Sequence, residues 1–305
     1  MKKTLLLAGL LLPPLLLLAT FRAAPLPAAA PFAGALPPAS PPAAMAVFQL
    51  PTGVTHRSAG IAYRGGSLFE KRDFAMTAVL VRHPRGDLLI DTGFGRGIAT
   101  HFRAMPVWFR LLTPYTAWQP AAAQLAAAGY DPGRLRGILL THAHWDHVSG
   151  IPDFPGTPVW VTAAERRFIT EGGMLTAVVR GFAGTRYEEY DFEGGPYLGF
   201  AKSHDVYGDG AIVIVPAPGH TPGSVIVFLT PPGGQRYALV GDLAWQQEGI
   251  TRRAERPWLQ RTLGDADEQG VRDLLSRMAA LATRFPELIL VPAHDARGFA
   301  AMPRL

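Results

Sequence analysis

The residues best suited to chemistry lie in one short segment, 142–147, which reads His-Ala-His-Trp-Asp-His. In an extended segment, His142 and His144 point to the same side because they are two residues apart. Asp146 and His147 can reach the same place from the turn that follows. Neutral imidazole nitrogens and a carboxylate are ligands that suit zinc, or less selectively iron, manganese or cobalt. The segment therefore predicts a metal site, with an exposed polar loop as the alternative.

Three further candidate ligands follow predicted strands elsewhere in the chain. His220 lies in a loop rich in proline and glycine after a strand over 211–215, Asp242 ends a strand over 237–240, and His294 lies just beyond a third strand. Each of these residues alone would more often be an ordinary loop residue. Together with the first segment, they are too many for one tetrahedral zinc with an open position, and enough for two metals that share a carboxylate.

The composition excludes several other chemistries. The chain of 305 residues has no cysteine, which rules out a cysteine nucleophile, an iron–sulfur cluster, a Cys-type zinc finger and a disulfide framework. The formal charge of +5 falls to +2 without Lys2, Lys3 and Arg22, because 26 basic residues then face 24 acidic ones. Basic residues spread this evenly do not form the concentrated patch typical of nucleic-acid binding, so we expect no nucleic-acid partner.

The first 45 residues have the composition of a leader rather than of a folded core. A positive start, an apolar run over 5–19 and small residues after it follow the order of a secretory signal. The run has about 15 residues, fewer than the ~20 of a membrane-spanning helix, and Pro13 and Pro14 interrupt it. We expect a signal peptide over 1–24, an Ala/Pro-rich linker over 25–45, and a periplasmic or secreted protein. Contact with the membrane is expected only through the leader, if it is not cleaved.

Short apolar runs between turn residues predict the elements that position the ligands. Runs over 75–81 and 88–90 flank a turn with proline and glycine, and predict a β-hairpin. The pattern predicts further strands over 137–140, 159–161, 211–215, 225–229, 237–240 and 288–291, and helices over 120–128, 162–168 and 267–285. Strands and helices alternate without an internal repeat, which predicts an α/β or mixed α+β class.

The order of these motifs resembles the metallo-β-lactamase superfamily, from about residue 46 to near the C-terminus. Four motifs match: Leu-Ile-Asp-Thr-Gly over 89–93, the segment 142–147, the His220 loop, and Asp242 followed by His294. The resemblance implies a four-layer αββα sandwich, with a metallo-β-lactamase-like hydrolase domain over 46–305.

The same resemblance implies two Zn²⁺ ions per chain, although other divalent metals would also fit. His142, His144 and His220 would hold one ion, and Asp146, His147 and His294 the other. Asp242 would bridge the two ions. Asp91, in the first motif, would support the site without binding metal.

Within the superfamily, the residue at the bridging position separates the alternatives. One class of zinc β-lactamases has a thiolate near this position, and this chain has no cysteine. A neighbouring β-lactamase class lacks the bridging aspartate, and this chain has Asp242. Glyoxalase II shares the ligands, but its usual residues after the bridging aspartate are absent from 243–246. The stretch 205–224 is most similar to N-acyl homoserine lactonases. The resemblance therefore favours opening of a lactone or related ester, with β-lactam or thioester hydrolysis as alternatives.

The expected substrate is a small molecule with an ester-like carbonyl. Two divalent ions lower the pKa of a bridging water enough to give hydroxide near neutral pH. Asp146 is the candidate to pass a proton to the leaving alkoxide. Trp245 stands where the best-known lactonases carry a tyrosine, and is the second catalytic candidate; its indole N–H donates a hydrogen bond but is not an acid.

Three other features have two interpretations each. The apolar segment 102–115 forms either a mobile lip for an acyl chain or a helix packed on the sandwich. The charged run 252–256 either binds an acidic group or is a solvated surface. Asp295 either orients a metal ligand or is a turn residue.

Overall fold

The structure is a computed structural model that describes residues 18–305. Most of the predicted signal peptide, residues 1–17, lies outside the described residues. Within 18–305, no helix is both long enough and apolar enough to cross a membrane.

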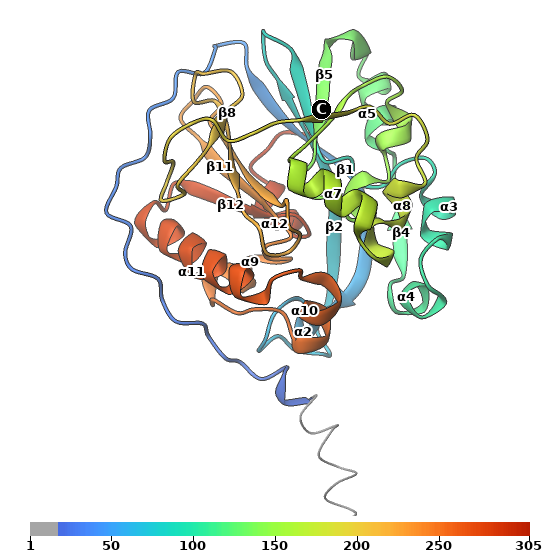
Figure 1. Ribbon diagram of the computed structural model, residues 1–305, viewed down its shortest axis with the longest axis vertical. Helices are drawn as coiled ribbons and strands as arrows, with labels where there is room; N and C mark the ends of the chain where they lie inside the picture. Colours follow the sequence, from blue (N-terminus) through green and yellow to red (C-terminus); the bar gives the residue numbers. More distant parts are fainter. Residues whose placement is uncertain (1–17) are drawn as a thin grey trace, which may run out of the picture.

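Two β-sheets form the centre of the described chain (Figure 1). In spatial order, the seven-stranded sheet contains β4 (Tyr115–Ala117), β1 (Ala46–Ser58), β2 (Lys71–Arg82), β3 (Asp87–Ile90), β5 (Leu135–Leu139), β6 (Val159–Val161) and β7 (Tyr187–Glu189). The five-stranded sheet contains β12 (Leu288–Pro292), β11 (Arg236–Gly241), β10 (Val225–Leu229), β9 (Ile212–Pro216) and β8 (His204–Asp205). Strands β3, β5, β6 and β7 run parallel, as do β11 and β12, and the other neighbours are antiparallel.

The two sheets pack face to face because their strands alternate between two apolar faces. In β2, Val79 and Val81 point into the core between the sheets, where they join Ile214 of β9 and Val227 of β10. The alternate residue Leu80 points to the opposite face, under the helices. Strands that are apolar on both faces are typical of sheets covered on both sides.

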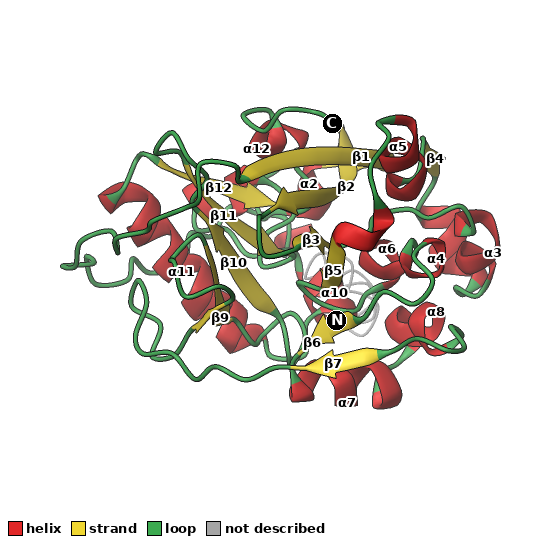
Figure 2. Cartoon of the chain, turned by 90° about the horizontal axis from the view of Figure 1, so that it is seen from above, coloured by secondary structure: helices red, strands yellow, loops and turns green. Residues whose placement is uncertain are grey.

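Helices cover the outer face of each sheet (Figure 2). The helix α11 (Glu268–Arg284) places Val271, Leu275 and Met278 against the five-stranded sheet. On the opposite side lie α3 (Ile98–Arg103), α4 (Val107–Leu112), α5 (Ala121–Ala127), α6 (Trp145–Val148), α7 (Ala163–Glu171) and α8 (Ala177–Arg180). The remaining helices are α2 (Ala59–Ala62), α9 (Gln247–Thr251), α10 (Trp258–Gly264) and α12 (Ala296–Phe299). There are also 3₁₀ turns at Pro132–Arg134, Ile151–Asp153 and Met174–Thr176. The expected αββα sandwich is confirmed.

The predicted hairpin is present as β2 and β3, and the other predicted strands and helices are present with shifts of a few residues at their ends. The N-terminal caps follow the expected chemistry: Thr162 accepts a hydrogen bond at the start of α7, and Asp267 does so at the start of α11. The sequence analysis did not predict β1, which is the longest strand of the described chain, nor the small helices α9 and α10. It gave a helix as one interpretation of the segment 102–115, which contains α4.

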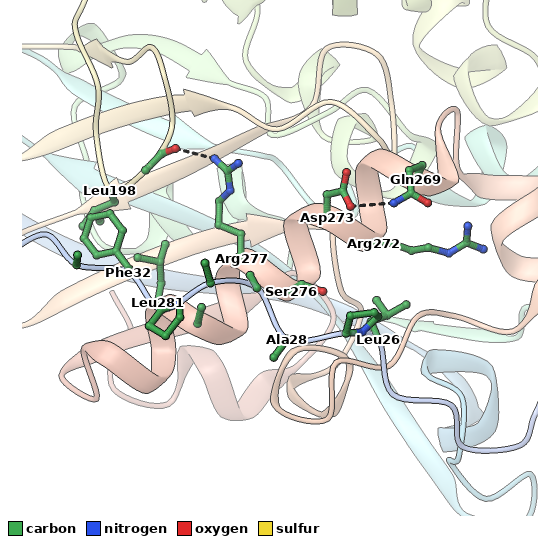
Figure 3. Close-up of a pocket in the computed structure, with 17 residues that line it drawn as sticks. Leu26, Ala28, Phe32, Leu198, Gln269, Arg272, Asp273, Ser276, Arg277 and Leu281 are labelled. Atoms are coloured by element: carbon green, nitrogen blue, oxygen red, sulfur yellow. Dashed lines mark hydrogen bonds between the residues drawn. The ribbon is translucent and has the colours of Figure 1, made fainter.

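The linker 25–45 crosses the outer surface as extended chain against the domain (Figure 1). Phe32 packs edge-on against Phe285, and the backbone N–H of Leu26 donates to the carbonyl of Arg253. Between residues 26–33 and α11, this segment encloses a cavity of about 700 Å³ (Figure 3). None of the predicted site residues lines this cavity.

Candidate metal centre

The ends of several strands meet at one edge of the sandwich, and the predicted ligands lie there. His142 follows β5, and His144 precedes α6. Asp242 follows β11, and His294 follows β12; these two strands are parallel, so their carboxyl ends lie side by side. All seven predicted ligands are buried: His142, His144, Asp146, His147, His220, Asp242 and His294.

The ligand atoms of these residues form three overlapping groups. In each group, one possible ligand atom per residue lies within 4.8 Å of the others. The groups are His142 with His144 and His220, Asp146 with His147 and His294, and Asp242 with His142 and His147. Asp242 thus lies next to one member of each of the other two groups, which is where a carboxylate shared by two metals must lie.

Several buried polar atoms in the centre have no hydrogen-bond partner, although such atoms are normally satisfied. Among the described residues, these include Nε2 of His142, His144 and His147, and Oδ1 of Asp242. In addition, Nδ1 of His144 lies only 2.9 Å from Nε2 of His220. Converging imidazole and carboxylate atoms without partners fit divalent metal ions of the zinc type.

The pKa shifts set the charges of the ligands in the metal-free centre. Burial holds the pKa of His142 and of His144 well below the usual value, so both imidazoles are neutral. Burial alone would raise the pKa of Asp242, but attraction to His294 and His147 lowers it well below its usual range. Burial likewise opposes the charge on His147, but Asp91 and Asp242 together raise its pKa well above the usual value. Without metal, His147 is therefore protonated, and a metal ion bound to its imidazole would take the place of this proton.

Three of the histidines are oriented by hydrogen bonds from Nδ1, which leave Nε2 directed at the centre. His147 donates to Asp91 Oδ2 over 2.8 Å, and His294 donates to a backbone carbonyl over 2.9 Å. His220 donates to Asp265 Oδ1 over 2.8 Å. Asp91 has a φ of 53°, which is uncommon for a residue other than glycine, and its side chain also accepts two hydrogen bonds from Thr141. Asp91 thus has the supporting position that the resemblance implied.

Glu165 connects the two loops that carry the histidines, and the sequence analysis did not identify it. Its carboxylate accepts hydrogen bonds from the N–H of Ala143, between His142 and His144, and from Thr221, next to His220. Burial raises the pKa of Glu165 to about 7. A residue placed in this way fixes the spacing of the two loops without touching a metal.

Trp245, a predicted catalytic residue, lies against the bridging position. Its indole N–H donates to Asp242 Oδ2 over 2.8 Å, and its ring packs edge-on against Phe74. Asp295, by contrast, caps α12 and accepts from the N–H of Gln247. The structure therefore supports the turn-residue interpretation of Asp295.

The charged run 252–256 is not a fully solvated surface. Glu255 and Arg256 are buried, and Arg256 donates to the carbonyl of Asp242 over 2.6 Å and also contacts Asp265. Glu255 pairs with three arginines, including Arg261. Glu255 and Arg256 thus belong to a buried ionic network behind the metal centre, which neither sequence interpretation anticipated, whereas Arg252 is exposed.

A cavity of about 340 Å³ opens on the metal centre. Asp146, Asp242 and His294 lie in its wall together with Trp245. The remainder is largely apolar and includes Trp108, Phe109, Leu112, Leu259 and Leu263. This cavity is smaller than the one beneath residues 26–33, but of the two it alone is lined by predicted metal ligands.

The two halves of the segment 102–115 differ in burial. Phe102, near the end of α3, and Met105, just after it, are buried in the core. Leu111 and Leu112 of α4 are 76% and 69% exposed. The first half therefore packs on the sandwich, and the second half forms an apolar rim of the cavity.

The fold and this centre together define a metal-dependent hydrolase. A sequence profile of the Metallo-beta-lactamase superfamily matches residues 73–294, and the chain belongs to this superfamily.

Known relatives agree with this assignment. The probable metallo-hydrolase Rv2300c of Mycobacterium tuberculosis is 33% identical over 230 residues, which cover 71% of this chain and 73% of that protein. N-acyl homoserine lactonase AttM of Agrobacterium fabrum is 28% identical over 188 residues, covering 56% of this chain and 67% of AttM. A solved structure of a mutant of Bacillus thuringiensis AiiA, with N-decanoyl-L-homoserine bound at its active site, has a similar fold: the TM-score is 0.65, with 17% identity over 85% of this chain and 96% of AiiA.

Proposed function

We propose that this protein is an exported dinuclear zinc hydrolase that opens lactones or related esters. The observation that carries the proposal is the sharing of Asp242 between the histidine groups, at the wall of a largely apolar cavity. The similarity to N-acyl homoserine lactonases supports the choice of a lactone.

In this proposal, His142, His144 and His220 would hold one zinc ion, Asp146, His147 and His294 would hold the other, and Asp242 would be shared by the two. When bound, two such ions supply a water of lowered pKa that can act as a hydroxide nucleophile near neutral pH, and polarise the carbonyl of the substrate.

The protein's own side chains orient the reactants and handle the proton. In this proposal, Asp146 carries a proton to the leaving alkoxide; its position in the wall of the cavity, 3.5 Å from His294 Nε2, supports this role. Trp245 acts mainly through Asp242, whose carboxylate it holds by a hydrogen bond. The apolar walls of the cavity exclude water from the rest of the substrate.

The test is a substrate panel on zinc-loaded protein. We expect hydrolysis of N-acyl homoserine lactones that a chelator abolishes and zinc restores, with little activity on nitrocefin, a thioester or bis(p-nitrophenyl) phosphate. Asp242→Asn should reduce the activity to background, while Asp209→Asn, at a carboxylate bound to His83 away from the centre, should not. Preferred cleavage of nitrocefin or the phosphodiester, or activity unchanged in Asp242→Asn, would overturn the proposal.

Export rests on the leader and has its own test. We expect the full-length protein, made in a Gram-negative host, to be found in the periplasm or medium with a new N-terminus near residue 25. Protein that stays in the cytoplasm with residues 1–24 attached would contradict export.

A further inference from the structure

One cationic side chain borders the catalytic cavity without a carboxylate partner. Arg57 and Thr55 project from the same face of β1, two residues apart, and both line the cavity together with Asp146 and Asp242. Among residues 18–305, Arg57 is the only arginine or lysine in that lining, and no carboxylate forms a salt bridge with it. Its side chain donates one hydrogen bond, from Nη2 to Thr113 Oγ1 over 2.8 Å.

The other buried arginine near the centre is bound differently. Arg256 contacts Asp265 and donates to the carbonyl of Asp242, and it does not line the cavity. Its charge is therefore already satisfied by the protein. Arg57 lines the cavity and has five N–H donors, of which Thr113 takes one; its guanidinium also lies 6.0 Å from the centre of the Trp245 ring.

Two carboxylates act on Arg57 without pairing with it directly. Burial lowers the pKa of Arg57, and attraction to Asp146 and Asp242 opposes this shift. A guanidinium remains charged in proteins. Since neither aspartate forms a salt bridge with Arg57, an acceptor oxygen from a ligand is an available partner whether or not the centre holds metal.

The rest of the cavity indicates what else such a ligand contains. Trp108 and Leu112 of α4 face Leu259 and Leu263 of α10 in an apolar lining that suits a hydrocarbon chain. A substrate that reaches the metal centre with its reacting carbonyl, and this lining with its chain, occupies the same cavity that Arg57 lines.

We infer that Arg57 is a specificity-determining residue, which donates hydrogen bonds to a second oxygen acceptor of the substrate. This acceptor is an amide carbonyl or a carboxylate, and in the substrate it lies between the reacting carbonyl and an apolar chain. The inference rests on the proposed function for the reacting carbonyl, but the binding of the acceptor and the chain does not depend on turnover.

The first test uses the full-length chain without metal. Binding of N-methyldecanamide and of decanoate is followed by tryptophan fluorescence, since Trp108 and Trp245 line the cavity. Because a hydrogen bond from a charged donor contributes about 1.5–3 kcal/mol, Arg57→Met should weaken binding of the preferred probe roughly 10- to 100-fold. Arg57→Lys should recover part of the loss. The tighter-binding probe in wild type identifies the acceptor as the amide or the carboxylate.

The matched control is an arginine outside the cavity. Arg103 also donates from Nη2 to a threonine hydroxyl, that of Thr100, but it does not line the cavity. We expect Arg103→Met to change probe binding less than about threefold. An equal loss in Arg103→Met and Arg57→Met, or no loss in Arg57→Met, would overturn the inference.

The second test uses the zinc-loaded enzyme and two lactones of equal chain length, one with an acyl amide and one with a plain alkyl chain. Wild type should prefer the amide-bearing lactone, and Arg57→Met should remove this preference, mainly through KM. A fall of equal size for both lactones would show a general structural role instead. If wild type hydrolyses neither lactone, the proposed function fails, and probe binding by the metal-free chain still decides the role of Arg57.

Discussion

Asp265 is expected to set the affinity of the metal group that contains His220. Its carboxylate accepts from His220 Nδ1 over 2.8 Å and contacts Arg256, and its side chain is fully buried. Asp265→Asn keeps the shape and one acceptor oxygen but removes the charge. A hydrogen bond to a charged group contributes about 1.5–3 kcal/mol and a neutral one about 1 kcal/mol, and loss of such a partner lowers metal affinity about 10- to 100-fold. We expect a loss in this range for one of the two metals only.

The assay is competition between the metal-free protein and a fluorescent zinc indicator, which resolves two binding steps. The matched control is Asp209→Asn, because Asp209 also bonds to a buried histidine, His83, and to an arginine, Arg85, but outside the centre. Thermal unfolding of both metal-free variants measures any general loss of stability. Wild-type zinc affinity in Asp265→Asn, or an equal loss in Asp209→Asn, would refute the reasoning.

Three more predictions test other parts of the account. The Glu165→Gln side chain has one acceptor oxygen, so it cannot accept all the hydrogen bonds that Glu165 accepts from the two histidine loops. The substitution should lower the free energy of unfolding by about 1–3 kcal/mol and weaken zinc binding. Unchanged zinc affinity would contradict this prediction. For Glu248, burial opposes its charge, but hydrogen bonds from Arg297 and attraction to Arg72 lower its pKa to about 2. Glu248 therefore stabilises the fold above its unfolded-state pKa of about 4.5, and this contribution is lost as pH falls toward 2. Glu248→Gln should lower the free energy of unfolding by at most about 1 kcal/mol near pH 7, as measured by chemical unfolding of the metal-free protein. The difference in free energy between wild type and variant should narrow between about pH 4.5 and 2. A difference that does not change with pH would contradict this prediction. Removal of residues 1–24 takes Phe21 out of the cavity wall and should weaken binding of N-methyldecanamide roughly threefold to tenfold. The full-length Phe21→Leu variant, which keeps an apolar side chain there, is the control. Equal affinities of the truncated and the full-length wild-type chain would show that Phe21 does not contact the hydrocarbon chain of the probe.

The metal ligands were predictable because their signal is local. The segment 142–147 concentrates ligand types in a few positions, and Asp242 and His294 each follow an apolar run that reads as a strand. Strand ends gather at one edge of a sandwich, so the order of motifs already brings these residues together.

The residues that support the ligands were less predictable, because their roles depend on contacts between distant segments. Asp265 reaches His220 from across 45 positions, and nothing in its neighbourhood distinguishes it from an ordinary loop aspartate. Arg256 reads as part of a solvated charged run, although the fold buries it behind the centre. Asp91 was the exception because a motif shared with the superfamily contains it.

The strand β1 was missed for a local reason, and Arg57 was missed with it. Pro51 and Gly53 interrupt the apolar alternation of 46–58, and both residues are typical of turns. In the structure, the register of β1 against β2 shifts between these two residues, and the strand continues beyond them to Ser58. A bulge therefore has the same sequence signal here as a strand end.

The central claim is that this chain holds two metal ions in the groups that share Asp242. Its most direct test is the metal content of purified, zinc-equilibrated protein, by plasma mass spectrometry, for wild type, His294→Ala and the control His83→Ala. The account predicts about two zinc ions per wild-type chain, about one in His294→Ala, and two in His83→Ala, because His83 lies outside the three ligand groups. One ion or none in wild type, or no loss in His294→Ala, would contradict it.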